Sequence, residues 1–169
     1  MNPADCKCTL QTTNAKLNPL CEKDAEFIFN LLNSDGWLRF IGNRNINSLD
    51  DAKNYIYKVM ANSQAAYWIV FVNMEAIGLI TLIKRDYLSS PDIGFAFLPQ
   101  YQQKGFAFET TNCVIDYLQR EKGVSKLSAI CTIDNDASIK LLEKLGFSFL
   151  QEIIVEGEEL NAYFRSVAK

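Results

Sequence analysis

The sequence predicts an α/β protein in which helices cover both faces of a mixed β-sheet. Apolar residues recur at helical spacing in some segments, shorter β-rich runs lie between them, and turns rich in Gly, Pro or Asn separate the two kinds of segment. The order along the chain is a strand, two helices, a hairpin, strand–helix–strand–helix and a terminal hairpin, which suits such a sheet. With 169 residues, we expect a single domain over residues 1–169, with residues 1–8 as a flexible tail.

The N-terminal segment is predicted to contain a strand, a helix and a loop. Residues 9–20 alternate loosely between apolar and polar and suggest a strand. Residues 22–32 have helical spacing, with acidic residues in the first turn, where the helix dipole favours them. Residues 37–47 are predicted as a loop with exposed aromatic residues. This loop either lines a substrate cleft or is a packed connector.

A second helix and a hairpin follow. Ser48-Leu49-Asp50-Asp51 resembles a capping box and opens a helix that extends to about residue 62. Residues 67–72 and 76–84 are apolar and β-rich, and the turn at 73–75 predicts that they pair as a hairpin.

Strands and helices alternate in the remainder of the chain. The predicted strands are the apolar runs at 92–98, 126–132, 147–155 and 160–167. The predicted helices are 105–120, closed by Gly123, and a shorter one that begins at Asp134 or Asn135 and ends at Gly146.

Composition narrows the classes of function. The net charge of −3 gives no basic surface for nucleic acid, and no apolar run approaches the roughly 20 residues of a membrane helix. The N-terminus has no secretion signal, and the five cysteines are an odd number, so we expect a cytoplasmic protein with reduced thiols. With no histidine, a Ser-His-Asp mechanism and a His-based metal site are excluded. Cys6-x-Cys8 is interpreted as two incidental thiols, and no metal is expected.

The segment from 91 to 108 predicts an anion site built from backbone. An apolar strand stops at Pro99, a polar turn follows, and a long amphipathic helix begins. Successive amides at a helix start bind phosphate, and Gly105 lets the backbone approach a ligand closely. Lys104 adds a positive charge, and Ala107 is small. We interpret this segment as the pyrophosphate site of a coenzyme, although the heptapeptide by itself would also fit an ordinary helix start.

The context of this segment resembles a known family. Gln102-x-x-Gly105-x-Ala107 resembles the signature of the GNAT acyltransferases. Three further segments resemble its branch of RimJ and RimL ribosomal-protein N-acetyltransferases: residues 92–99, residues 39–42, and Asn135-x-x-Ser138 followed by residues 141–147. The resemblance covers about residues 10–165.

The resemblance implies the GNAT fold, with about seven strands, about four helices and a splay between strands 4 and 5 that holds pantetheine. It also implies transfer of an acetyl group from acetyl-CoA to a primary amine, by direct attack in a ternary complex. Backbone groups of Phe97 and Leu98 would bind pantetheine, and the Leu98 amide would hold the oxyanion. The pyrophosphate would be bound by the amides of Gln103, Lys104, Gly105, Phe106, Ala107 and Phe108. Asn135 would contact the pantetheine arm or a water beside it.

The proton-transfer roles are less fully specified by the family pattern. Many members place a tyrosine acid on the fourth helix, where this sequence has Leu142. Ser138 is the candidate acid instead; the alternative is that it only caps or packs the helix. Asp92, or a water that it orients, is the candidate base, with the closing of a turn as the alternative. Cys131 is interpreted as a buried thiol.

Three functions stay open at this point. The first is acetylation of a protein or peptide N-terminal α-amine, whose pKa of about 8 requires only a modest base, against about 10.4 for lysine. The second is acetylation of a small amine such as a polyamine, an amino sugar or an amino acid analogue. The third is a catalytically weak module that binds CoA as a sensor. The loops at 37–47 and 85–90 are expected to select the acceptor, and the protein is expected to be a monomer or homodimer.

Overall fold

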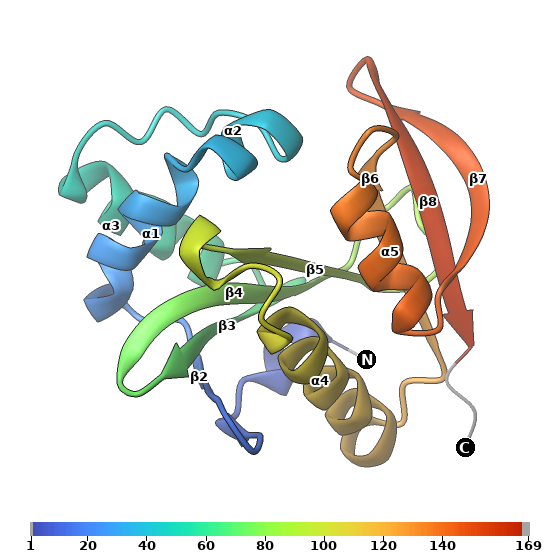
Figure 1. Cartoon of the computed structure of the whole chain (residues 1–169), viewed down its shortest axis with the longest axis horizontal. Helices are drawn as coiled ribbons and strands as arrows, with labels where there is room; N and C mark the ends of the chain where they lie inside the picture. Colours follow the sequence, from blue (N-terminus) through green and yellow to red (C-terminus); the bar gives the residue numbers. More distant parts are fainter. Residues whose placement is uncertain (1, 167–169) are drawn as a thin grey trace.

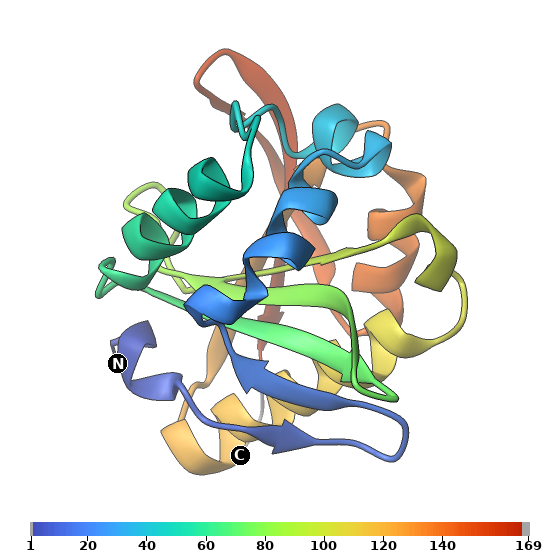
Figure 2. The same ribbon diagram turned by 90° about the vertical axis from the view of Figure 1, so that its left-hand side faces the viewer.

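A computed structural model describes residues 2–166 of the chain. These residues form an 8-stranded sheet in the order β1-β2-β3-β4-β5-β6-β8-β7 (Figures 1 and 2). The strands are β1 (Leu10–Gln11), β2 (Lys16–Pro19), β3 (Ala65–Val72), β4 (Glu75–Ile83), β5 (Asp92–Phe97), β6 (Lys126–Thr132), β7 (Ser148–Val155) and β8 (Glu158–Ser166). The α-helices are α1 (Ala25–Leu32), α2 (Asp35–Phe40), α3 (Leu49–Met60), α4 (Phe106–Lys122) and α5 (Asp136–Lys144). Short 3-10 turns lie at Pro3–Cys6, Glu22–Asp24 and Pro99–Tyr101.

Helices cover both faces of the sheet, as the sequence predicts. Side chains alternate between faces along a strand, so neighbouring residues of β3 enter different cores. Ile69 belongs to the core under α1, α2 and α3, whereas Trp68 belongs to the core that contains α4 and α5 (Figure 2). Within residues 2–166, no helix has the length and apolar character needed to cross a membrane.

The sheet divides where its one parallel pair of strands meets. The neighbours β1 to β5 are antiparallel, as are β6, β8 and β7. The strands β5 and β6 run parallel but pair only at Asp92 and Ser128, with the Ser128 amide donating to the Pro91 carbonyl at 2.9 Å. Beyond that point they separate (Figure 1). This confirms the predicted splay, because the fourth and fifth predicted strands are β5 and β6.

The local sequence signals place most helix ends correctly. The Ser48 side chain accepts from the Asp51 amide, and the Asn135 side chain accepts from the Ser138 amide. Gly123 and Gly146 adopt the left-handed conformation (φ 64° and 80°) that closes a helix. The predicted strand at 126–132 and the hairpin of β3 and β4 are also confirmed.

The predictions for the N-terminal region need correction. Residues 9–20 form two short strands rather than one, and Asp35–Phe40 is a helix rather than part of a loop. Trp37, predicted to be exposed, is only 7% accessible because it packs in the core under α1 and α3.

The first residues are not a flexible tail where the structure describes them. Cys6 is buried, the Ala4 amide donates to the Ser63 carbonyl, and the Trp68 indole donates to the Cys8 carbonyl at 3.0 Å. The turn at Pro3–Cys6 packs against β3, and Cys6 belongs to the core, so these residues are held to the folded domain. Met1 of the predicted tail and Val167 of the last predicted strand lie outside the described residues.

A close contact between β4 and β5 fixes the end of β5. Gly78 pairs with Phe97, and a Cβ built on Gly78 would lie 2.3 Å from the Phe97 ring. The absence of a side chain at position 78 therefore allows the ring to lie across β4.

We expect Gly78→Ala to lower the free energy of unfolding by about 1–3 kcal/mol, because the new methyl group overlaps the ring and displaces it. Urea denaturation measures the change. Gly36→Ala is the matched control, since a Cβ there would meet only the Gln102 side chain at 3.9 Å. Equal stability of the two variants would contradict the prediction.

Candidate functional site

A large cavity occupies the splay between β5 and β6. Its volume is about 1700 Å³, larger than the roughly 300–1,000 Å³ typical of a pocket for one ligand. Its walls include β5, β6, the starts of α4 and α5, and the segment at 41–46. The cavity therefore has room for two substrates at once.

The start of α4 presents backbone amides to this cavity. Gln103 and Gly105 both have positive φ (58° and 88°), which turns the chain into the helix. Among the described residues, the amides from Gln103 to Phe108 have no acceptor, as expected for the first turn of a helix. A Cβ on Gly105 would meet nothing within 4 Å, so the space in front of these amides is open. The arrangement suits an anion with several oxygens.

Not every side chain predicted at this site faces the cavity. Gln103, Gly105, Ala107 and Phe108 line it, whereas Lys104 and Phe106 do not. The Lys104 ammonium lies 5.4 Å from the centre of the Tyr101 ring. Two lysines that the sequence analysis did not select, Lys140 and Lys144 of α5, line the cavity instead. These two lysines reach the cavity because α5 packs beside α4, and no local sequence motif indicates that packing.

The prediction for the Leu98 amide is wrong. This amide donates to the Ile77 carbonyl of β4 at 3.0 Å and cannot hold an oxyanion in the splay. Backbone groups alternate between the two sides of a strand. Because Leu98 points to β4, the amides and carbonyls of Phe95 and Phe97 point toward β6, where the gap has opened. The Gln102 side chain donates to the Phe97 carbonyl at 3.0 Å.

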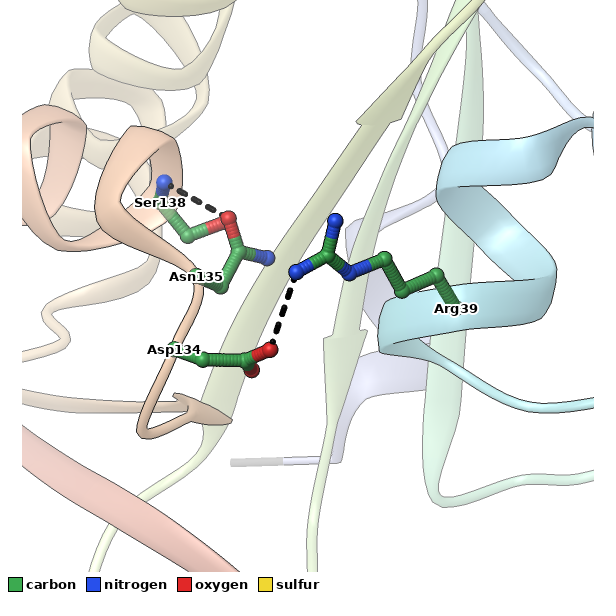
Figure 3. Close-up of polar contacts among 4 residues, drawn as sticks. All are labelled: Arg39, Asp134, Asn135 and Ser138. Atoms are coloured by element: carbon green, nitrogen blue, oxygen red, sulfur yellow. Dashed lines mark hydrogen bonds and ion pairs between the residues drawn. The ribbon is translucent and has the colours of Figure 1, made fainter.

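The start of α5 forms another wall of the cavity (Figure 3). The Asn135 side-chain oxygen accepts from the Ser138 amide at 3.1 Å, which fixes the first turn of the helix. Both residues line the cavity, and Ser138 is half-buried. The interpretation of Asn135 as a cap is confirmed, and the Ser138 hydroxyl is left at the cavity surface.

An ion pair connects two walls of this cavity. Arg39 of α2 contacts Asp134, just before α5, at 3.2 Å (Figure 3). Both side chains are mostly exposed. The nearby side chains of Thr132 and Arg39 stabilise the charged form of Asp134 and so lower its pKa. Exposed pairs of this kind contribute about 0–1 kcal/mol, so the bridge is weak and can open.

Asp92 is buried at the closed end of the splay. It is 3% accessible, and its Oδ2 accepts from the Arg85 Nε at 2.6 Å. Burial raises the pKa of the Asp92 carboxyl, and the positive charge of Arg85 opposes that rise. Its second oxygen, Oδ1, has no hydrogen-bonding partner among the described residues. Asp92 lines the cavity, but this oxygen itself is buried.

Tyrosines and cationic residues form the wall opposite α5. Tyr55, Tyr67 and Tyr87 line it together with Arg44 and Arg85. Burial raises the pKa of Tyr67 to about 12, so this phenol stays neutral and can donate a hydrogen bond. The sequence analysis missed the tyrosines, because Tyr55 and Tyr67 look like ordinary members of an amphipathic helix and a strand. Burial also raises the pKa of Cys131 to about 11, in keeping with an unreactive buried thiol.

Comparisons with known proteins agree on the family. The sequence matches the acetyltransferase (GNAT) domain over residues 15–148. It is 30% identical over 146 residues to the uncharacterized N-acetyltransferase YoaA of Bacillus subtilis, covering 82% of this chain and 81% of that one. It is 24% identical to the spermidine N(1)-acetyltransferase of Escherichia coli K12, covering 89% and 78%. The fold matches RimL, a ribosomal L7/L12 alpha-N-protein acetyltransferase in complex with coenzyme A, with a TM-score of 0.82, 16% identity and coverage of 95% and 98%.

We expect Arg85→Gln to be less stable than the parent by about 2 kcal/mol near pH 7, because it leaves a buried carboxylate without its cation. Without Arg85 the pKa of Asp92 rises further. A carboxyl whose pKa is higher in the folded state than in the unfolded state lowers the free energy of unfolding at high pH. This loss of stability decreases as the pH falls through the folded pKa and is gone below the unfolded pKa of about 3.9. The deficit should therefore shrink toward about pH 4.

Urea denaturation of parent and variant across this pH range measures the difference. Lys84→Gln is the control, because it removes a neighbouring exposed charge that has no ion pair among residues 2–166. A deficit that stays constant with pH would contradict the assigned coupling of Arg85 and Asp92.

Proposed function

Because this chain belongs to the GNAT acetyltransferases, which are acetyl-CoA-dependent acyltransferases, we propose that it acetylates the N-terminal α-amine of a protein or peptide. The run of amides from Gln103 to Phe108 that lack an acceptor within residues 2–166 supports a coenzyme site here. The pyrophosphate of acetyl-CoA supplies the acceptors that these amides lack.

The pantetheine arm fits the gap between β5 and β6. The backbone groups of Phe95 and Phe97 face this gap without a partner strand, so an extended arm with amide groups can replace the missing strand. In this geometry an amide of Phe95 or Phe97, rather than that of Leu98, donates a hydrogen bond to the oxyanion. Such a donor typically contributes a few kcal/mol to the transition state.

The residues around the gap assist two changes: the loss of a proton from the attacking amine and the departure of the thiolate. The attacking amine must be neutral, and its proton passes to Asp92 Oδ1 when a local opening admits a water to this buried oxygen, since Oδ2 is held by Arg85. The Ser138 hydroxyl donates a hydrogen bond to the departing thiolate. A serine is a weak acid, so its contribution is stabilisation of the leaving sulfur rather than full proton transfer.

The α-amine is favoured over a more basic amine by its pKa. An α-amine loses its proton near pH 8, whereas a lysine or polyamine nitrogen holds it to about 10.4. A buried carboxylate already paired with Arg85 is a modest base, which suits the first kind of acceptor. The likeness in fold to RimL also supports this choice.

A small polyamine is the second candidate acceptor. The observation in its favour is the 24% identity to the E. coli spermidine N(1)-acetyltransferase over 89% of this chain. Glu156 and Glu158 also line the cavity and would attract a cation.

We expect Gly105→Glu to weaken acetyl-CoA binding by more than about tenfold, because a carboxylate would occupy the space in front of the amides and repel the pyrophosphate. Isothermal titration calorimetry measures the dissociation constant. Gly123→Glu is the matched control, since Gly123 also has a positive φ (64°) and open space around its Cβ position. If both variants bind acetyl-CoA like the parent, the proposed coenzyme site is wrong.

With acetyl-CoA and a peptide that has a free N-terminus, we expect release of CoA thiol in step with acetylation of the α-amine. Ser138→Ala should lower kcat by about tenfold, the cost of one lost hydrogen bond to a charged group. A thiol-trapping dye and mass spectrometry of the peptide are the measurements.

Ser148→Ala, at the exposed start of β7, is the control for Ser138→Ala. Spermidine as the acceptor tests the second candidate at equal concentration. Tight acetyl-CoA binding with no thiol release from any amine would refute the enzyme and favour a CoA-binding sensor.

A further inference from the structure

The wall of the cavity opposite α5 contains one arginine, Arg44, that has no ionic partner in the described part of the chain. Its guanidinium lies over Gly42, where a Cβ would stand 3.6 Å from an Arg44 nitrogen. Gly42 has a φ of 100°, so the chain turns there in a conformation that suits glycine. The turn places the guanidinium at the exposed surface of the cavity wall.

The neighbouring charges do not neutralise Arg44. Asp92 lies on the same side of the cavity but is already paired with Arg85 at 2.6 Å. Asp51 accepts from the Asn47 amide at 2.9 Å and so holds the start of α3. Glu156 follows β7 and Glu158 begins β8, and neither forms an ion pair with Arg44. On α3, Lys58 adds a second positive charge to the wall of Arg44.

Two phenols complete this corner of the cavity. Tyr55 and Tyr67 line it, and Arg44 acts electrostatically on both. Their hydroxyls make no hydrogen bond to any described residue. Burial keeps both phenols neutral, so they can donate to an acceptor oxygen. A free guanidinium and two free hydroxyls form a set of donors without an anion.

We propose that the acceptor carries a carboxylate close to its reacting amine, and that Arg44, Tyr55 and Tyr67 bind this carboxylate. The inference rests on the proposed acetylation of an α-amine and specifies which α-amines are preferred: those whose N-terminal residue is acidic. Glu156 and Glu158, which also line the cavity, then attract the ammonium group of the same residue before it is deprotonated. The site recognises a dipolar end group.

The alternative occupants fit this corner less well. The coenzyme phosphates have their own donors at Gln103–Phe108, on the wall formed by the start of α4. A polyamine would place positive charge beside Arg44 and Lys58, which is repulsive at short range. The preference for an acidic residue therefore runs opposite to that expected for a spermidine acetyltransferase.

The test compares two amidated peptides that begin with Asp or with Asn and are otherwise identical. For the parent protein we expect kcat/KM to be at least about tenfold higher for the Asp peptide, the effect of one charge-assisted contact. In Arg44→Gln the ratio of the two values should fall to about one, and Arg44→Lys should restore part of it. Spermidine should be the poorer acceptor for the parent.

Arg120→Gln is the matched control, because it removes the same charge from an exposed position in the last turn of α4 and should keep the parent ratio. Circular dichroism checks that the variants fold. Equal kcat/KM for the two peptides, an unchanged ratio in Arg44→Gln, or preference for spermidine would overturn the inference while acetyl transfer itself stands.

If no amine is acetylated, the proposed function fails, and the anion site is then tested by binding alone. Isothermal titration calorimetry measures the dissociation constants of both peptides with CoA-loaded protein. Tighter binding of the Asp peptide that is lost in Arg44→Gln supports the anion site, and equal binding refutes it.

Discussion

The early separation of β5 from β6 is the constraint on which the rest of the structure depends. Backbone amides and carbonyls inside a protein need partners, and a sheet normally supplies them from the next strand. Here the pairing ends after Asp92 and Ser128. The groups of Phe95 and Phe97 are left facing a cavity, and the first turns of α4 and α5 border the same space. The protein is thus built around an incomplete sheet, and we propose that the pantetheine arm of the coenzyme takes the place of the missing strand.

The positions of the charged residues follow from this geometry. At the closed end of the gap there is little water, and a carboxylate is retained there only with Arg85 beside it. At the open end, Arg39 and Asp134 remain in water and interact weakly. Arg44 is also exposed, but it lines the cavity and forms no ion pair within residues 2–166. Its guanidinium is therefore available to bind an anionic group of a ligand.

Sequence reasoning predicted the features that are coded locally. Ser48, Asn135 and Gly123 mark helix ends through contacts within a few residues, and the strand at 126–132 follows from its own apolar run. The glycine turn before α4 was found for the same reason. The error at Leu98 has a different origin: which amides face the gap depends on the pairing of Gly78 with Phe97, and that register is not written in either strand. The Arg39–Asp134 contact joins residues 95 positions apart, and no spacing rule predicts it.

The Arg39–Asp134 bridge has a consequence for the shape of molecule that can enter. It joins α2 to the loop before α5, and other residues of α2 and α5 line the cavity (Figure 3). Because the pair is exposed, a molecule that needs more room can break it at a cost of only about 0–1 kcal/mol. The bridge is thus a contact that an incoming acceptor can displace.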